Sequence, residues 1–381
     1  MRNKKILTVV RWPLGGIRTY MRYVYQNFDS EWQITILAAD VQESSALRED
    51  AKLLGAELIL APASPLGFLW TVFRILAQRR HDIIQSQGFI SAITACLANL
   101  FFRKPHVLTV HGVLEDRLLQ GLRGHLKRLV TNWAICSVDV VYAVSEDILA
   151  HVQKQVPCLA RSKVKQVAIM NGIDPNIFLE PRAPGEFRRR NDLGSDLFLF
   201  GFLGRFMPQK GFDRIIEALV HLEKISVPCE YCLLAIGSGD YQSHYESLAK
   251  EKGVFHRIVF LPFQQDVSSI YHDLDAVVMP SRWEAFGLLA SEALVSGVPL
   301  ITSDCLGLRE VVRHTPAIVV PDGDPQGLAH AMLNLLNFNY KQIFKEYSGE
   351  AAIRFDVLNT SNSLMLLLTE LLELKKRRCC Q

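Results

Sequence analysis

The stretch Ser281–Leu294, SRWEAFGLLASEAL, decides the fold. It follows a short apolar run, Ala276–Met279, that Pro280 closes, and its second half reads as a helix. A buried strand, a turn and a helix in this order form the repeating unit of a parallel α/β sheet. Such sheets bind ligands beyond the carboxyl ends of their strands. The carboxylates of Glu284 and Glu292 therefore lie near a predicted ligand edge.

The acids of this stretch have two interpretations. Acidic residues near a helix N-terminus can serve only to stabilise the helix dipole. Alternatively, the N–H groups of a helix N-terminus bind phosphate, and a nearby carboxylate accepts hydrogen bonds from sugar hydroxyls. A glycine on the turn would let the backbone approach a ligand closely. On the second interpretation the candidate binding residues are Glu284, Phe286, Gly287, Leu288 and Glu292.

Strand-like and helix-like runs alternate on both sides of this stretch. The chain has 381 residues, which suggests two domains. The alternation predicts an α/β protein with two parallel, Rossmann-like halves, and a ligand site in the cleft between two facing halves. We assign residues 1–172 to the first half and 197–357 to the second. Residues 173–196 are rich in Pro, Arg and Asn and are predicted to be a linker.

Composition narrows the class of protein. The net charge of +3 gives no argument for nucleic-acid binding. No apolar run approaches the ~20 residues of a membrane-spanning helix, and the N-terminal run is too short for a signal peptide. Eight cysteines are scattered, and the Cys229–Cys232 pair is better interpreted as buried thiols than as half a zinc site. We therefore expect a reducing, cytoplasmic location.

The first half offers two candidate positions. Gly15 and Gly16 lie at the first strand-to-helix turn, where they form either a simple tight turn or a ligand loop; the pattern is not G-x-G-x-x-G, so a dinucleotide is not favoured. His111 ends the strand-like run Val107–Val110 and is followed by Gly112. Its place at a strand's carboxyl end directs it to the ligand edge, although a lone histidine is usually structural.

The second half offers a candidate phosphate site. Gly204 and Arg205 end its first strand, and Lys210 opens the next helix. An arginine can grip phosphate with a fork of donors and a lysine adds a point charge, so the pair suits a diphosphate. The alternative is two cations that simply face solvent. Gly237 forms a further glycine loop after the strand Tyr231–Ile236.

These segments together resemble the retaining glycosyltransferases of the GT4 type (glycosyl transferases group 1), which have the GT-B fold of two facing Rossmann-like domains. The resemblance is carried by the E-x7-E pattern of Glu284 and Glu292, the GR-x4-KG pattern of residues 204–211 and the PLGGI pattern of residues 13–17. It departs from the family at Leu308, where a second glycine is usual, and this affects Glu310 and the local loop.

The resemblance implies transfer of a hexose from a UDP- or GDP-linked donor to a saccharide or lipid-linked acceptor, in polysaccharide or glycolipid biosynthesis. It also implies that the C-terminal helix, 358–381, packs back on the first half. By the same resemblance, the Gly15–Gly16 loop lies near the sugar phosphate, and His111 and Glu284 bind the donor sugar. Arg205 and Lys210 bind the leaving diphosphate, Glu292 binds the ribose and Phe263 lies near the base. The other residues implied to surround the donor are Gly204, Gly237, Phe286, Gly287 and Leu288.

Two alternatives of different class remain: a nucleotide-sugar epimerase or hydrolase on the same fold, and a non-catalytic sugar-nucleotide-binding partner subunit. A D-x-D pattern, Asp273–Asp275, matches the metal signature of another glycosyltransferase fold, but it precedes a strand and so lies at the wrong end for a site. We therefore predict no metal and no cofactor. Retaining glycosidases use a carboxylate nucleophile, and no carboxylate replaces His111 here, so same-face substitution is the favoured mechanism.

One more feature is a basic amphipathic segment, Leu119–Trp133, which alternates Arg and Lys with leucines. It either lies on an anionic membrane surface or packs on the first half with a solvated basic face. The basic tail, residues 375–380, is better interpreted as solvated than as an anchor.

Overall fold

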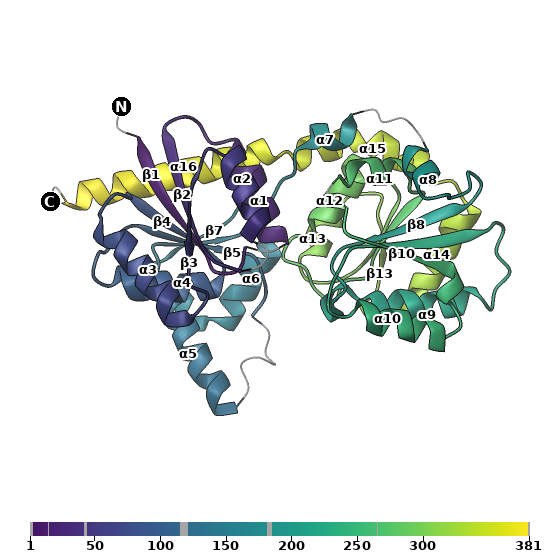
Figure 1. The fold of residues 1–381 in the computed structure, drawn as a ribbon, viewed down its shortest axis with the longest axis horizontal. Coiled ribbons are helices and arrows are strands. Elements are labelled where there is room, and N and C mark those ends of the chain that lie inside the picture. The colour runs from purple at the N-terminus through teal and green to yellow at the C-terminus, as the bar shows by residue number, and fades with distance from the viewer. Residues whose placement is uncertain are drawn as a thin grey trace. The chain divides into compact units, whose positions relative to one another are not determined.

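The computed structural model describes residues 3–13, 15–41, 44–114, 121–180, 185–264 and 266–379. The chain forms two compact units (Figure 1): unit 1 contains Met1–Gly172 and Val357–Gln381, and unit 2 contains Ile173–Asp356. Leu14 of the PLGGI pattern, the first two residues of the basic segment and the end of the basic tail lie outside the described residues. Each unit is an α/β domain with one parallel sheet, so the predicted fold class is confirmed.

The sheet of unit 1 has the strand order β3-β2-β1-β4-β5-β6-β7, and every pairing is parallel. The order reverses after β3, and right-handed crossovers then place α1 and α2 on one face and α3 to α6 on the other. The elements are β1 (Lys4–Val10), α1 (Gly16–Gln26), β2 (Trp32–Ala39), α2 (Ser44–Leu53), β3 (Glu57–Ala61), α3 (Pro65–Ala77), β4 (Ile83–Gln87), α4 (Phe89–Asn99), β5 (His106–Val110), α5 (Gly121–Ser137), β6 (Val140–Ala143), α6 (Glu146–Gln155) and β7 (Lys165–Ala168).

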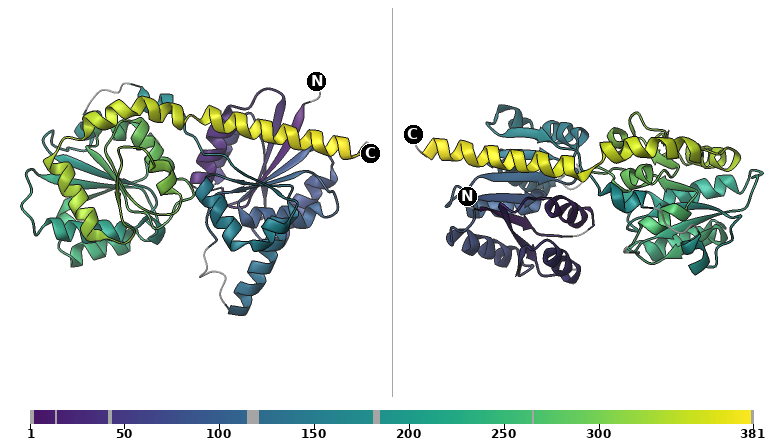
Figure 2. Two further views of the ribbon diagram at one scale, coloured as in Figure 1. Left: turned by 180° about the vertical axis from the view of Figure 1, so that it is seen from behind. Right: turned by 90° about the horizontal axis from the view of Figure 1, so that it is seen from above.

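Helix α16 (Val357–Cys379) completes unit 1, although it is the last element of the chain. It runs along the unit beside α1, as both views in Figure 2 show. Its Ser361 hydroxyl donates to the carbonyl of Val24, and its Thr360 hydroxyl donates to that of Met170, at 3.0 and 2.7 Å. Leu364 and Leu368 are fully buried. The helix is therefore part of the core of unit 1.

The sheet of unit 2 has the order β10-β9-β8-β11-β12-β13, again all parallel. Its aromatic-rich core lies between β8 and α9 and includes Phe202, Phe206 and Phe212. None of the helices in the described ranges is long and apolar enough to cross a membrane. The elements are β8 (Phe198–Leu203), α9 (Phe212–Leu222), β9 (Tyr231–Ile236), α10 (Gln242–Glu251), β10 (Ile258–Leu261), α11 (Ser268–Asp273), β11 (Ala276–Met279), α12 (Leu288–Val295), β12 (Leu300–Ser303), α13 (Leu308–Val312), β13 (Ile318–Val320), α14 (Pro325–Asn337) and α15 (Lys341–Arg354).

The stretch 173–196, predicted to be a linker, is instead part of unit 2. It contains two short helices, α7 (Pro175–Leu179) and α8 (Glu186–Arg190), which contact α11 and α12. The carboxylate of Asp273 accepts backbone N–H bonds from Gly185, Phe187 and Arg188 at 2.6, 2.7 and 3.1 Å. These bonds satisfy the N–H groups at the start of α8, which a helix cannot satisfy internally, and they fix the stretch against the unit.

Candidate functional site

The carboxyl edge of the unit 2 sheet brings two predicted glycine loops together. The Gly204 N–H donates to the carbonyl of Ile236, and the Phe206 N–H donates to that of Ser238, both at 3.0 Å. Gly237 has a φ of +154°, and a Cβ there would lie 1.8 Å from the carbonyl oxygen of Gly204. Only glycine permits this approach. The loops after β8 and β9 are therefore packed closely against each other at the ligand edge.

Lys210 and Glu284 are joined by an ion pair. Lys210 precedes α9 and Glu284 follows β11, and the lysine Nζ lies 2.7 Å from Glu284 Oε1. The hydroxyl of Ser281 donates to the same oxygen at 2.7 Å. Both side chains are largely buried. Both side-chain hydrogen bonds of Glu284 to the described residues therefore go to Oε1 and not to Oε2.

The turn between Glu284 and α12 is tightly packed. Gly287 caps α12 with a φ of +85°, and a Cβ there would lie 2.4 Å from Leu308 Cδ2. Leu308, the departure from the family pattern, is fully buried and fills this space. Phe286 is also buried, with its ring against Phe355. The Phe286 side chain is therefore part of the packing of unit 2, whereas Leu288, the first residue of α12, is partly exposed.

Glu292 lies one to two turns into α12 and is buried. Its Oε2 accepts a hydrogen bond from the Tyr271 hydroxyl of α11 at 3.0 Å. The ring of Tyr271 packs edge-on against Phe178 of α7, with ring centroids 5.8 Å apart. The two acids of the E-x7-E pattern thus have different partners: Glu284 faces a cation and Glu292 a phenol.

The remaining predicted residues of unit 2 are exposed. Arg205 and Phe263 lie in the loops after β8 and β10, and both face solvent. The loop that carries Lys210 is held from the other side by Arg282, whose guanidinium pairs with Asp213 at 2.6 Å and whose N–H donates to the carbonyl of Gln209 at 2.8 Å. Arg282 therefore fixes the backbone next to Lys210.

In unit 1, His111 follows β5 and is joined to a buried polar network. Its Nε2 lies 2.6 Å from Gln87 Oε1. Gln87 Nε2 donates to the Tyr25 hydroxyl at 2.9 Å, and this hydroxyl donates to Gln85 Oε1 at 3.0 Å. The Tyr25 hydroxyl also contacts the Thr8 hydroxyl at 2.9 Å. The amide of Gln87 is assigned with its oxygen toward His111, and since an amide oxygen only accepts, this assignment puts the His111 proton on Nε2.

Burial lowers the pKa of His111 to about 3, so the ring is neutral near pH 7. Its ring packs edge-on against Tyr20 of α1, with centroids 4.6 Å apart. Gly15 is the N-cap residue of α1, and Gly16 is its first residue. Because β1 is separated from β5 by β4 alone, the Gly15–Gly16 turn and His111 lie at the same edge of the sheet.

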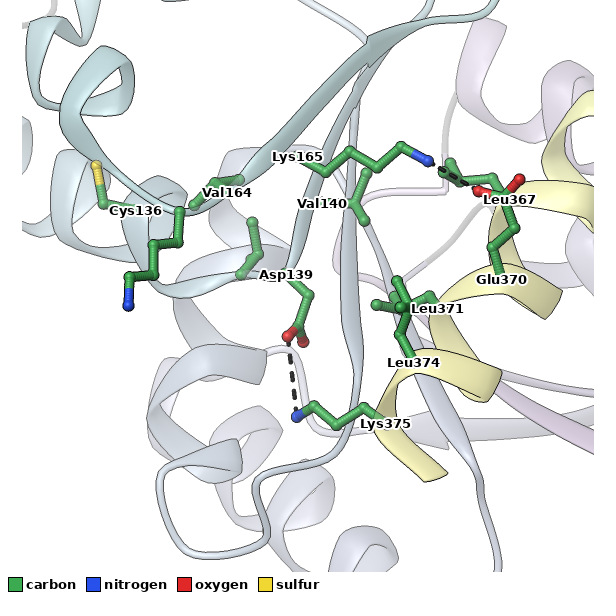
Figure 3. A pocket seen from close by; sticks show the side chains of 12 residues that line it. Cys136, Asp139, Val140, Val164, Lys165, Leu367, Glu370, Leu371, Leu374 and Lys375 are labelled. Atoms are coloured by element: carbon green, nitrogen blue, oxygen red, sulfur yellow. Dashed lines mark hydrogen bonds and ion pairs between the residues drawn. The ribbon is translucent and has the colours of Figure 1, made fainter. Parts of the chain in front are cut away.

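A groove of about 240 Å³ in unit 1 contains none of the predicted residues. It lies beneath α16 and is spanned by the ion pairs Lys165–Glu370 and Asp139–Lys375, at 2.9 and 3.8 Å (Figure 3). Asp139 and Lys165 lie at the amino ends of β6 and β7, whereas α/β sheets bind ligands at the carboxyl ends. The groove is therefore the seat of α16 and not a candidate substrate site.

The sequence prediction missed several residues at these edges. Gln87 and Tyr25 orient His111, Ser281 shares Glu284 with Lys210, and Tyr271 holds Glu292. One signal was present in the sequence. The run Gln85-Ser86-Gln87 places three polar residues in a central, buried strand, and buried polar groups need partners.

Both metal-signature carboxylates have structural partners. Asp273 holds the start of α8, and Asp275 pairs with Arg188 at 2.6 Å and also with Lys341. Asp275 also accepts the N–H of Leu199 at 2.8 Å. Both acids lie before β11, at the end of the sheet opposite the glycine loops.

In comparisons with known proteins, the two halves of the chain match two different family descriptions. Residues 14–177 match the family described as Glycosyltransferase Family 4, and residues 185–352 match Glycosyl transferases group 1. The chain is 28% identical over 299 residues to an uncharacterized glycosyltransferase of Methanocaldococcus jannaschii, covering 72% of this chain and 74% of that protein. It is also 28% identical over 305 residues to the D-inositol 3-phosphate glycosyltransferase of Corynebacterium urealyticum, covering 75% and 70%.

The crystal structure of Anabaena HepE in complex with UDP and glucose superposes with a TM-score of 0.81 at 20% identity, covering 97% of this chain and 100% of that one. At this identity the superposition supports the fold alone. The glycosyltransferase activity is indicated by the two family matches, one for each half of the chain. The chain is thus a GT-B-fold glycosyltransferase that resembles the GT4 type.

Proposed function

We propose that this glycosyltransferase moves a hexose, with retention, from a UDP- or GDP-linked sugar to a saccharide or lipid-linked acceptor. The observation that carries the proposal is the buried Lys210–Glu284 ion pair at the ligand edge of unit 2, beside the exposed Arg205. In this proposal the lysine of the pair binds phosphate and the carboxylate accepts hydrogen bonds from sugar hydroxyls. Solved complexes of HepE contain UDP and UDP-glucose, which supports a nucleotide sugar as donor.

The nucleotide part of the donor is assigned to unit 2. Arg205 and Lys210 hold the diphosphate, which also faces the N–H groups at the start of α12. The glycine loops after β8 and β9 let the backbone approach it closely. Glu292 is assigned to the ribose hydroxyls and Phe263, exposed beyond β10, to the base.

The sugar hydroxyls are assigned to Glu284 of unit 2, and a separate hydroxyl contact is assigned to His111 of unit 1. Oε2 of Glu284 accepts from a sugar hydroxyl, while Oε1 keeps its bonds to Lys210 and Ser281. His111, with its proton on Nε2 directed at Gln87, offers Nδ1 as an acceptor. A neutral histidine that is oriented in this way positions a hydroxyl without adding charge.

When the sugar leaves, negative charge develops on the β-phosphate. Preorganised cations stabilise this charge without reorganisation during the reaction, and Arg205 with Lys210 supplies them. The proposal includes no metal ion or cofactor. This choice is supported by the hydrogen bonds and ion pair that hold Asp273 and Asp275 in structural roles. Since His111 is not a carboxylate, we favour attack of the acceptor on the face that the diphosphate leaves. If EDTA abolishes transfer and Mg²⁺ restores it, metal independence is wrong.

The acceptor side is assigned to unit 1. We propose that the enzyme acts in polysaccharide or glycolipid biosynthesis at the cytoplasmic side of a membrane. In this proposal the basic helix α5 contacts anionic lipid. Arg123 and Lys127 are exposed on α5, and basic amphipathic helices bind anionic bilayers. The curated relatives include an O-antigen biosynthesis glycosyltransferase, WclY of Escherichia coli.

A screen of nucleotide sugars by thermal shift tests the donor assignment. A ligand that binds only the native state raises the apparent stability by mass action. We expect a UDP- or GDP-linked hexose to raise the melting temperature of the wild-type protein and to do so far less for Lys210→Gln. The matched control is Lys224→Gln, an exposed lysine that follows α9. Equal shifts in all three proteins would remove Lys210 from the donor site.

A further inference from the structure

Three neighbouring helices of unit 1 contain no acidic residue. Helices α3, α4 and α5 follow one another around the sheet, and α4 packs against both of the others (Figure 1). Their sequences contain no Asp or Glu, but they contain Arg74, Arg123, Lys127 and Arg128. Surface helices normally carry charges of both signs, so this layer stands out as purely basic.

The same layer exposes large apolar side chains. On α5, Leu122, Leu126 and Leu129 recur at helical spacing, and Leu122 is 93% exposed. On α3, Leu66 and Trp70 form an outer stripe with Arg74, and Trp70 is 61% exposed. Monomeric proteins seldom expose contiguous apolar patches without a function. These stripes are therefore candidates for a contact surface.

Ring contacts join α3 to the end of α4. The ring of Trp70 stacks on Phe73 at 5.8 Å, and Phe73 meets Phe101 edge-on at 5.7 Å. Phe101 lies in the turn after α4 and is 75% exposed. Exposed Arg103 follows it in the same turn. An aromatic cluster bordered by cations is the composition found at the interface between lipid headgroups and acyl chains.

We propose that α3, α4 and α5 form one membrane-docking face, which inserts its aromatic and leucine side chains into an anionic bilayer. The face is defined by Leu66, Trp70, Leu97, Leu100, Phe101, Leu122, Leu126 and Leu129, with Arg74, Arg103, Arg123 and Lys127 between them. It extends the contact assigned to α5 in the proposed function from one helix to three. A bilayer is favoured over a protein partner because the charges are of one sign and complement anionic headgroups.

The face makes two contributions to binding. Each exposed leucine or aromatic ring that enters the bilayer removes apolar surface from water, and each lysine or arginine is attracted to the anionic surface within about a Debye length, ~8 Å at physiological salt. Neither contribution suffices for stable attachment in most peripheral proteins. Binding should therefore require both anionic lipid and the apolar residues.

The test is co-sedimentation of the full chain with vesicles of phosphatidylcholine, with and without phosphatidylglycerol, in the absence of any donor. We expect binding only to the vesicles with phosphatidylglycerol, and weaker binding as salt rises. Two multiple variants should each lower the partition coefficient by about tenfold or more. The first combines Trp70→Ser and Phe101→Ser, and the second combines Leu122→Ser, Leu126→Ser and Leu129→Ser. Because these side chains are exposed, both variants should remain folded.

A matched control replaces three exposed apolar residues on other helices: Leu53→Ser, Leu366→Ser and Ile353→Ser. This control should bind vesicles like the wild-type protein. Trp70 supplies a second measurement, since its fluorescence should shift to the blue on binding and the shift should be lost in Trp70→Phe.

Three results would overturn the proposal. The first is wild-type binding by the Trp70 and Phe101 variant, and the second is an equal loss in the control. The third is a wild-type dimer in sedimentation velocity that the leucine variant converts to monomer, which would make the face a contact between copies of the chain. Calorimetric titration with UDP and with GDP keeps the two proposals apart, because nucleotide binding should be unchanged in every face variant.

Discussion

Glu284 and Glu292 have the same chemistry but different surroundings. Glu284 is bonded to Lys210 and Ser281, and Glu292 is bonded to Tyr271. The donor sugar changes shape and charge at the transition state, whereas the ribose does not. Contacts to the sugar should therefore act on kcat, and contacts to the ribose should act mainly on KM.

We predict that Glu284→Gln lowers kcat by about ten- to a thousandfold, equivalent to ~1.4–4 kcal/mol of transition-state stabilisation. Glu292→Gln should instead raise the donor KM and weaken binding of the bare nucleoside diphosphate. Steady-state kinetics and calorimetry measure both effects, with the exposed Glu217→Gln as control. The division of roles is refuted if Glu284→Gln weakens the nucleoside diphosphate as much as Glu292→Gln does.

Gln87 acts on His111 through one short hydrogen bond. We predict that Gln87→Leu frees the imidazole tautomer and lowers kcat by about tenfold, the value of one hydrogen bond of ~1.4 kcal/mol. Binding of the nucleoside diphosphate, assigned to unit 2, should not change. Nitrogen NMR of labelled histidine should report the Nε2–H form of His111 in the wild-type protein and in the control Gln166→Leu. An Nδ1–H form in the wild-type protein would contradict the network.

Buried His106 and half-buried His111 predict a pH dependence of stability. Burial lowers the pKa of His106 and of His111 to about 3, whereas an unfolded histidine has a pKa of about 6.5. Between these values the unfolded chain binds more protons, so the free energy of unfolding falls as the pH falls. The slope approaches about 1.4 kcal/mol per pH unit for each histidine. Urea titrations between pH 7.5 and 5 measure this slope, and the slope for His111→Gln should be less steep. Identical slopes would count against a His111 that is neutral in the folded protein.

At the scale of elements, α16 offers a matched pair of leucines. Leu368 is fully buried in unit 1, and Leu366, two residues away on the same helix, is exposed. We predict that Leu368→Ala lowers the free energy of unfolding by about 2–5 kcal/mol, as buried leucines do, and that Leu366→Ala changes it by less than about 0.5 kcal/mol. Chemical denaturation measures both. Equal effects would mean that the helix does not belong to the core.

The sequence predicts most strands because parallel, doubly covered strands appear as continuous apolar runs. The run Ala276–Met279 is β11 as predicted, and Gly204 and Lys210 lie at the predicted strand and helix ends. Helix α8, in the stretch taken as a linker, could not be predicted, because its first turn depends on bonds to Asp273 from far along the chain. A composition rich in Pro and Arg describes local preference and says nothing of such distant partners.

The side-chain pairs at the sheet edges could not be predicted from the sequence for a similar reason. The Gln87–His111 bond follows from the pairing of β4 with β5, and the Lys210–Glu284 pair follows from the pairing of β8 with β11. Neither strand order nor register can be read from one sequence. Once the order is known, these residues are brought together because they end neighbouring parallel strands.

At the scale of the whole molecule, the two units divide the proposed chemistry. Unit 2 contains Glu284, Glu292 and the cations that we assign to phosphate, and unit 1 contains His111, the Gly15–Gly16 turn and the basic helical layer. A nucleotide-binding regulator would need unit 2 alone, and a hydrolase or epimerase would need no acceptor. Acceptor-dependent transfer is therefore the property that separates the proposed function from its rivals.

The central claim is tested most directly by the release of nucleoside diphosphate from a nucleotide sugar that binds, with and without saccharide and lipid-linked acceptors. We predict release that depends on the acceptor, matched by one sugar gained on the acceptor with unchanged anomeric configuration, and reduced about tenfold or more by Lys210→Gln. The control Lys224→Gln should match the wild-type protein. Release at the same rate without any acceptor, or epimerised donor in its place, would contradict the assignment of sugar transfer.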